Sequence, residues 1–252
     1  MSATTAFAFV FLVFFCAIWL LRFSMGRDRA PTLRHIPAFD MMRGSLAAAA
    51  EDGRPIHVGL GTGGIADGHA METIAGLAAL EFFGEQAAIT SNVPLVTTGN
   101  PTTLLLAQDT LSRPFAERDH LAQFDPLAVR FMGGLANQTG AAYAAGVLDL
   151  LNRRDVAANY MLGHFDDEYL LLGDAGARNA VPQVAGAAST NALPFMALTA
   201  DRVLLGEELF ATGAYLLRRP WHIAGLAAQD TARWIIVGAV GVLVALRTLG
   251  LF

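Results

Sequence analysis

The chain contains no lysine; all 17 of its basic residues are arginine. Schiff-base chemistry, attachment of pyridoxal phosphate and a phosphate-binding P-loop each depend on a lysine amine, so the sequence excludes all three. The formal net charge is −5, whereas a nucleic-acid-binding protein carries a basic face. We therefore expect no nucleic-acid partner.

Cysteine is almost absent as well. Cys16 is the only one, and it lies in an apolar run, so no disulfide can form within one chain. The 6 histidines are scattered, with neither an HExxH motif nor paired cysteines, and the sequence therefore predicts no metal site. A nucleophilic serine in a GxSxG turn is also missing.

A long apolar run without charge lies near each end of the chain. Residues 6–21 read AFAFVFLVFFCAIWLL, and residues 234–246 read WIIVGAVGVLVAL. About 20 apolar residues cross a bilayer as a helix, so we interpret 1–24 and 234–252 as N- and C-terminal transmembrane anchors. A signal peptide is the alternative for the first, although no basic residue precedes it. A buried core helix is the alternative for the second, whose apolar run is short.

The arginines predict an orientation in the membrane. Those that lie on the domain side of the anchors are Arg22, Arg27, Arg29, Arg34, Arg218, Arg219 and Arg233, and only Arg247 lies at the far end. Basic residues favour the cytoplasmic side. We therefore expect a double-pass protein of the cell (inner) membrane, with a cytoplasmic middle domain and both termini on the opposite side. Residues 219–233 are amphipathic, and we expect them to lie along the membrane surface next to the second anchor.

Residues 35–218 have the pattern of one α/β domain. Short apolar runs that end near glycine alternate with helical stretches, which predicts a Rossmann-like parallel sheet with helices on both faces. The expected strands are 56–60, 94–98, 128–132, 156–162, 183–185 and 202–205. The expected helices are 39–51, 68–90, 102–120, 136–153, 167–180, 191–198 and 207–217.

A glycine-rich loop follows the first expected strand. Gly59, Gly61 and Gly64 fit GxGxxG between a strand and a helix, which is the setting of a dinucleotide-binding loop. Asn100 follows the second strand, where such folds carry an acid. These four residues are candidates for cofactor binding in a nucleotide or small-anion sensing domain. The alternative is a simple glycine turn in which Asp67 caps the next helix.

A histidine and several acids follow the fourth expected strand. His164, Asp166 and Asp167 would lie at the edge of the sheet where ligands bind in this fold. An imidazole beside carboxylates can perform general acid–base catalysis, so these are the candidate catalytic residues of a membrane-bound hydrolase or isomerase. That hypothesis requires His164 within about 3–4 Å of a carboxylate in a concave pocket. Helix capping by the acids is the alternative.

Several longer segments resemble those of a known protein family. AEDGRPIHVGLGTGG, VPLVTTGNPT, VAANYMLGHFDDEYLLLGDAGA, GEELFATGAYL and HIAGLAAQD occur in this order between the two apolar ends. In this the chain resembles an uncharacterised bacterial family of membrane-anchored proteins, a domain of unknown function with two terminal transmembrane segments. The resemblance covers most of residues 50–230. It implies a shared fold and anchoring, but no activity, cofactor or catalytic residue.

Taken together, the sequence favours a non-catalytic role. Its site chemistry is sparse, and Gly238, Gly241 and Ala245 would let transmembrane helices approach closely. We therefore expect a structural or assembly subunit without a cofactor, which forms a homo-oligomer or joins a larger membrane complex on the cytoplasmic face. The lipid bilayer is its other expected partner. The nucleotide or small-anion sensor and the hydrolase or isomerase are the two alternatives.

Overall fold

The computed structural model describes residues 3–25, 33–134, 139–153 and 156–249. The chain divides into two compact units. One is His35–Leu217, and the other combines Met1–Arg34 with Arg218–Phe252. Arg27 and Arg29, which contributed to the expected orientation, lie outside the described residues.

A parallel sheet of 6 strands forms the centre of the unit His35–Leu217. The strands are β1 (His57–Gly61), β2 (Leu95–Thr98), β3 (Val129–Phe131), β4 (Asn159–His164), β5 (Gln183–Ala187) and β6 (Arg202–Leu205). Their order is β3-β2-β1-β4-β5-β6, and every neighbouring pair is parallel. This is the order of the doubly wound dinucleotide-binding fold, which has its switch point between β1 and β4. All six expected strands are present, close to their expected positions.

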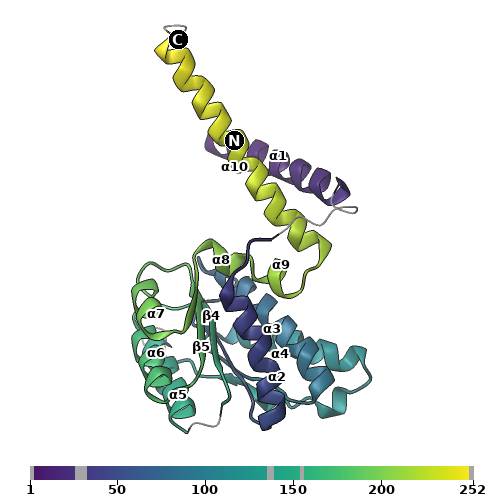
Figure 1. Ribbon diagram of the computed structural model, residues 1–252, viewed down its shortest axis with the longest axis vertical. Helices are drawn as coiled ribbons and strands as arrows, with labels where there is room; N and C mark the ends of the chain where they lie inside the picture. The colour runs from purple at the N-terminus through teal and green to yellow at the C-terminus, as the bar shows by residue number, and fades with distance from the viewer. Residues whose placement is uncertain (1–2, 26–32, 135–138, 154–155, 250–252) are drawn as a thin grey trace. The chain divides into compact units, whose positions relative to one another are not determined.

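Helices cover both faces of the sheet (Figure 1). One face carries α2 (Pro37–Asp52), α3 (Ala70–Thr90), α4 (Pro101–Glu117), α8 (Glu207–Phe210) and α9 (Thr212–Leu216). The other face carries α5 (Thr139–Asn152), α6 (Tyr169–Arg178) and α7 (Leu193–Thr199). The expected helix 207–217 is thus two short helices, and the start of the expected helix 136–153 lies outside the described residues. Two 3-10 turns, Leu121–Gln123 and Pro126–Ala128, lead from α4 into β3.

The core lies on both sides of the sheet because neighbouring side chains of a strand point to opposite faces. In β4, Tyr160 and Leu162 pack in the cluster on the α3 side, whereas Met161 packs with α5 and α6. Phe83 of α3 stacks on Tyr160 with ring centroids 5.1 Å apart. A sheet buried on both faces explains why its strands read as apolar runs without alternation.

The second unit contains two helices, α1 (Ala3–Met25) and α10 (Pro220–Thr248). Among the described residues, α10 is the one helix long and apolar enough to cross a membrane, which suggests membrane association. In α1 the described apolar stretch is shorter, Val10–Ser24. Most of the expected surface segment 219–233 and of the expected anchor 234–252 lies on the single helix α10. Hydropathy changes near Arg233, but no residue there ends a helix, so α10 continues.

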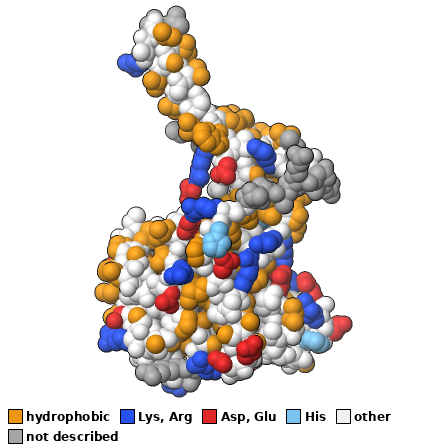
Figure 2. Space-filling model, viewed as in Figure 1, with side chains coloured by type: hydrophobic (Ala, Val, Ile, Leu, Met, Phe, Trp, Pro, Cys, Tyr) orange, Lys and Arg blue, Asp and Glu red, His pale blue; other side chains and the backbone are white. Residues whose placement is uncertain are grey.

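The first half of α10 packs against α1. Trp19 Nε1–H donates a hydrogen bond to the Trp221 carbonyl at 3.4 Å, and Arg22 Nε donates to Thr231 Oγ1 at 3.0 Å. The buried side chains of this half of α10 are Ala224, Ala228 and Ala232, which share one face. The apolar side chains further along α10 are exposed, and Figure 2 shows them on its surface. The amphipathic part of α10 thus packs against α1, and its expected place along the membrane surface stays a prediction.

Candidate functional site

A crevice opens at the carboxyl ends of β1, β2 and β4, at the switch point where ligands bind in open sheets. Its volume is about 510 Å³. The lining residues are Thr62, His69, Gly99, Asn100, Pro101, Phe131, Gly134, Thr139, Gly140, His164, Asp166 and Glu168. Among these described lining residues are two histidines and two acids, and no arginine.

The last residue of β4 is joined to the first turn of α3. His164 Nδ1 lies 2.7 Å from Glu72 Oε2, and both side chains are only 8% exposed. The Ala188 backbone N–H donates to the other oxygen of Glu72 at 2.8 Å. A carboxylate and an imidazole thus meet in a nearly buried place, where each fixes the orientation of the other.

The pKa values of this pair move apart. Burial alone would raise the pKa of Glu72, but the hydrogen bonds from His164 and Ala188 and the nearby imidazoles hold it below its usual value. Burial alone would lower the pKa of His164, but its hydrogen bond to Glu72 and the neighbouring carboxylates raise it above its usual value. Both directions favour a carboxylate facing an imidazolium.

The acids after β4 are arranged differently from one another. Asp166 Oδ2 lies 3.4 Å from His164 Nε2, and Ser189 Oγ donates to Asp166 Oδ1 at 2.9 Å. Glu168 lines the crevice and accepts the Asp166 backbone N–H at 3.2 Å. Asp167 is exposed in the turn before α6 and does not line the crevice. The structure therefore brings His164 and Asp166 together in a concave pocket and leaves Asp167 outside it.

Neither Glu72 nor His69 was predicted to be a site residue from the sequence. His69 immediately precedes α3, and its ring stacks on His164 with centroids 3.4 Å apart. Its Nδ1 lies 3.6 Å from Glu72 Oε2. The only local signal was the spacing of His69 and Glu72, because residues three apart share a helix face. The contact of Glu72 with His164 spans 92 positions and depends on the adjacency of β1 and β4.

The glycines of the loop at 59–64 are explained by close packing. Gly61 has φ +72°, and a Cβ there would collide with the carbonyl oxygen of His164. A Cβ at Gly64 would meet the side chain of Asn100, and one at Gly59 would lie 2.8 Å from the Tyr143 hydroxyl. The GxGxxG pattern is therefore required by neighbouring protein atoms.

A carboxylate of the protein accepts backbone N–H groups of the glycine loop. Asp67 accepts the backbone N–H of Gly64 at 2.7 Å and that of His69 at 2.8 Å. We expected Asp67 to cap the next helix, but α3 begins at Ala70 and Asp67 closes the loop instead. The Gly64 N–H is therefore already taken by a protein carboxylate.

Asn100, the other candidate for cofactor binding, caps a helix. Its Oδ1 accepts the backbone N–H of Thr102 at 2.9 Å and that of Thr103 at 3.4 Å, and Pro101 follows in the first turn of α4. This is the usual arrangement at a helix N-terminus. Asn100 still lines the crevice, so its amide forms part of the wall.

A buried polar chain runs from the glycine loop into the sheet. The Gly61 N–H donates to the Tyr143 hydroxyl at 3.4 Å, and Tyr143 and Thr97 hydroxyls lie 3.0 Å apart. Thr97 Oγ1 is 2.8 Å from His57 Nε2, and His57 Nδ1 is 2.6 Å from Asn159 Oδ1. All four side chains are buried. The crevice loop is thus tied to the core by hydrogen bonds.

Comparison with known protein families assigns the whole chain to one family. The model of a domain of unknown function, DUF6754, matches residues 1–252. The chain belongs to the DUF6754 family. No curated protein and no solved structure matches it. Membership in DUF6754 agrees with the resemblance to an uncharacterised family and assigns no chemistry to the crevice.

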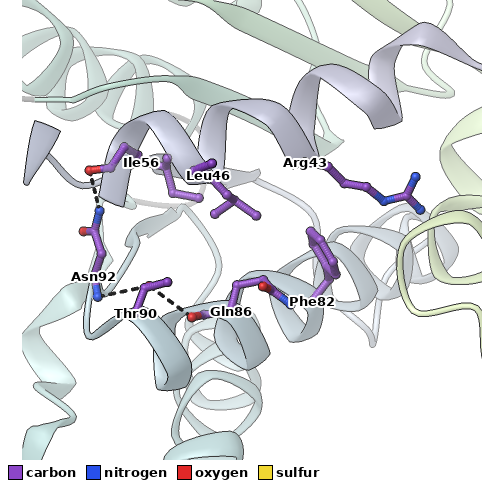
Figure 3. A pocket seen from close by; sticks show the side chains of 9 residues that line it. Arg43, Leu46, Ile56, Phe82, Gln86, Thr90 and Asn92 are labelled. Carbon is purple, nitrogen blue, oxygen red and sulfur yellow. Dashed lines mark hydrogen bonds between the residues drawn. The ribbon is translucent and has the colours of Figure 1, made fainter. Parts of the chain in front are cut away.

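This DUF6754 chain has a second cavity between α2 and α3, of about 390 Å³ (Figure 3). Its lining residues are Arg43, Leu46, Ala47, Ala49, Ile56, Phe82, Gln86, Thr90 and Asn92. Two of the polar side chains form hydrogen bonds with backbone carbonyl groups. Asn92 Nδ2 donates to the carbonyl oxygens of Ala49 and Arg54, and Thr90 Oγ1 donates to that of Gln86 at 3.0 Å. This cavity offers apolar walls rather than a reactive group.

Proposed function

We propose that this protein is a membrane-attached enzyme of the hydrolase or isomerase class, which acts on a small uncharged or cationic solute in the crevice. His164 and its carboxylate neighbours Glu72 and Asp166 form its chemical centre. The observation that carries the proposal is the 2.7 Å contact between His164 Nδ1 and Glu72 Oε2. A nearly buried imidazole that is oriented by a carboxylate at a ligand-binding crevice is the usual arrangement of an acid–base group.

The charge of the crevice supports this class of solute over a nucleotide. Glu72, Asp166 and Glu168 place carboxylates at or beside the crevice, and Asp67 occupies the loop amides. Like charges repel most strongly where water is partly excluded. A phosphate ligand would meet this repulsion, whereas an uncharged or cationic solute would not.

We propose that both terminal helices, α1 and α10, attach the protein to the membrane. The exposed apolar side chains of α10 and the apolar run of residues 6–21 support two membrane-spanning segments. The arginines on the domain side of each segment support a cytoplasmic domain with both termini across the membrane. On this basis the protein is a double-pass protein of a bacterial inner membrane, with the lipid bilayer as one partner.

A non-catalytic assembly role is the second candidate, and the surface of α10 favours it. A Cβ added at Gly238 or Gly241 would meet no described atom within 4 Å. Small residues on an exposed membrane helix allow a second helix to approach closely. Such a face supports a homo-oligomer or a larger membrane complex. Gly241→Leu would then lower the mass of the particle extracted in mild detergent without changing the fold of the domain.

The enzyme proposal is tested by substitution of the imidazole. Asn at position 164 retains an amide where His164 has Nδ1, so His164→Asn keeps a partner for Glu72 and removes the titratable ring. The full-length protein is screened in detergent against small uncharged and cationic esters, amides and isomerisable solutes. We expect turnover by the wild type to fall at least a hundredfold in His164→Asn. The control His120→Asn, outside the crevice, keeps full activity. Equal turnover by both variants would contradict the proposal.

A further inference from the structure

Three side chains with metal-ligating atoms converge beside the crevice. The ligand atoms of His69, Glu72 and His164 all lie within 4.8 Å of one another. His69 and Glu72 come from one face at the start of α3, and His164 ends β4. We infer that these three residues bind a divalent transition-metal ion of the zinc class.

The distances suit such an ion after a small adjustment. Ligand atoms about 2.0–2.2 Å from a tetrahedral zinc ion are about 3.4 Å apart. His69 Nδ1 is 3.6 Å from Glu72 Oε2, while His164 Nδ1 is 2.7 Å from it because a proton joins the two. An ion replaces that proton, and the two atoms then separate by less than about 1 Å. The stacked ring of His69 must also rotate, which its partly exposed position permits.

The groups behind the ligands provide an independent observation. Histidines that ligate metals commonly give their second ring nitrogen to a carboxylate, which fixes the ring and raises its basicity. His164 has this arrangement, since its Nε2 faces Asp166 at 3.4 Å while its Nδ1 faces Glu72. Asp166 is itself held by Ser189 at 2.9 Å. Glu72 is held from behind by the Ala188 N–H at 2.8 Å. Both buried ligands are therefore oriented before an ion arrives.

The ligand set indicates the class of ion. Two imidazoles and one carboxylate suit zinc and its neighbours, whereas magnesium and calcium prefer oxygen ligands alone. The cluster found among the described residues contains no thiolate. Glu72 and His164 are nearly buried, but the His69 side chain is 45% exposed. Three protein ligands with one side open to solvent are typical of a catalytic rather than a structural zinc site.

This inference deepens the proposed function and rests on it for the chemistry alone. An ion at this place would polarise a carbonyl group or activate a water molecule in the crevice. It therefore favours a hydrolase over an isomerase, acting on a solute with a carbonyl group. With an ion bound, His164 acts as its ligand and Asp166 orients the His164 ring, so the proton-accepting role passes to Glu168, which also lines the crevice.

The test measures zinc binding by the full-length protein, purified in detergent without a histidine tag and stripped with a chelator. Equilibrium dialysis against buffered Zn²⁺ is expected to give one ion per chain, not displaced by millimolar Mg²⁺. Glu72→Gln, His69→Asn and His164→Asn are each expected to weaken binding at least tenfold. His120→Asn, which lies outside the cluster, should bind as the wild type does. Absence of binding, or equal affinity in all variants, would overturn the inference.

A second measurement needs no substitution. Co²⁺ added to the stripped wild type should give the intense visible bands of a low-coordinate nitrogen and oxygen site, and Zn²⁺ should abolish them. Only the weak spectrum of hydrated Co²⁺ would count against the site. The activity screen separates this inference from the proposed function. If no metal binds but His164→Asn still abolishes turnover, the metal site fails and the enzyme proposal stands. If zinc binds but His164→Asn has no effect on turnover, the metal site stands and the enzyme proposal fails.

Discussion

His57 and Asn159 lie opposite each other on β1 and β4, and Asn159 Oδ1 is 2.6 Å from His57 Nδ1. Asn159 Nδ2 donates to Gln183 Oε1 at 2.9 Å, so its oxygen is left to accept. His57 must therefore carry its proton on Nδ1, and its Nε2 accepts from Thr97. The network assigns this tautomer, because each donor in the row then has one acceptor.

The position of this histidine predicts a pH dependence of stability. Complete burial, which outweighs the hydrogen bond to Asn159, lowers the pKa of His57 to about 4. An unfolded histidine titrates near 6.5, so between these values the unfolded chain binds more protons than the native one. The contribution of His57 to the free energy of unfolding is thus constant above about pH 6.5 and falls as the pH drops towards 4, by about 3 kcal/mol in total.

Denaturant unfolding of the full-length protein in detergent, from pH 7 to pH 4, measures this slope. His57→Gln should be less stable at pH 7 but should lose less stability on acidification. The comparison cancels the other groups that titrate in the same range. Parallel pH curves for the variant and the wild type would show that His57 is not neutral and buried in solution.

Thr97 belongs to the same buried polar chain as His57, and its hydroxyl contributes to the stability of the domain. Thr97→Val removes the hydroxyl that donates to His57 Nε2 and leaves the buried Tyr143 hydroxyl without this partner. We expect a loss of about 1–3 kcal/mol in the free energy of unfolding, because both groups remain buried. Thr110→Val on the half-buried side of α4 is the matched control and should change stability by less than about 0.5 kcal/mol. Similar losses of stability in both variants would contradict a stabilising role for the buried hydrogen bonds of Thr97.

Gly61 and Gly44 give a paired test of the glycine loop. Gly61→Ala meets the His164 carbonyl and adopts φ +72°, so it should destabilise the domain by several kcal/mol, about 1–2 of them from the backbone alone. Gly44 lies within α2, where a Cβ would meet nothing within 4 Å. Gly44→Ala should therefore raise stability by about 0.5–1 kcal/mol. Midpoints of thermal unfolding that move in the same direction would refute this account of the loop.

The proposed topology predicts where the domain can be labelled. In a Cys16→Ser background, a cysteine at exposed position Asp119 should react with a membrane-impermeant maleimide only after the cells are opened. Cysteine at position Thr248, beyond the apolar run of α10, should react in intact cells. The reversed pattern would place the domain outside, and equal labelling at both positions would rule out a double-pass arrangement.

The sequence predicted the sheet well because its signals are local. Each strand is a short apolar run that ends near glycine, as at Gly61 and Gly163, and each is followed by a helical stretch. Strand order was not predictable, since it depends on pairings between distant segments. The role of Glu72 was hidden for the same reason, because an acid in the first turn of a helix is already explained by the helix dipole. Likewise, hydropathy marked a change of surroundings near Arg233 but not the continuity of α10.

His57, Asn159 and Gln183 occupy directly opposed positions on three adjacent parallel strands. Shifting any one of these strands by a single residue would turn its polar side chain into the opposite layer, among Val58, Tyr160 and Val184. Parallel strands joined by long crossovers have no hairpin turns to align them. In this protein the hydrogen bonds among His57, Asn159 and Gln183 favour the observed register, because a one-residue shift would bury these polar groups without their partners.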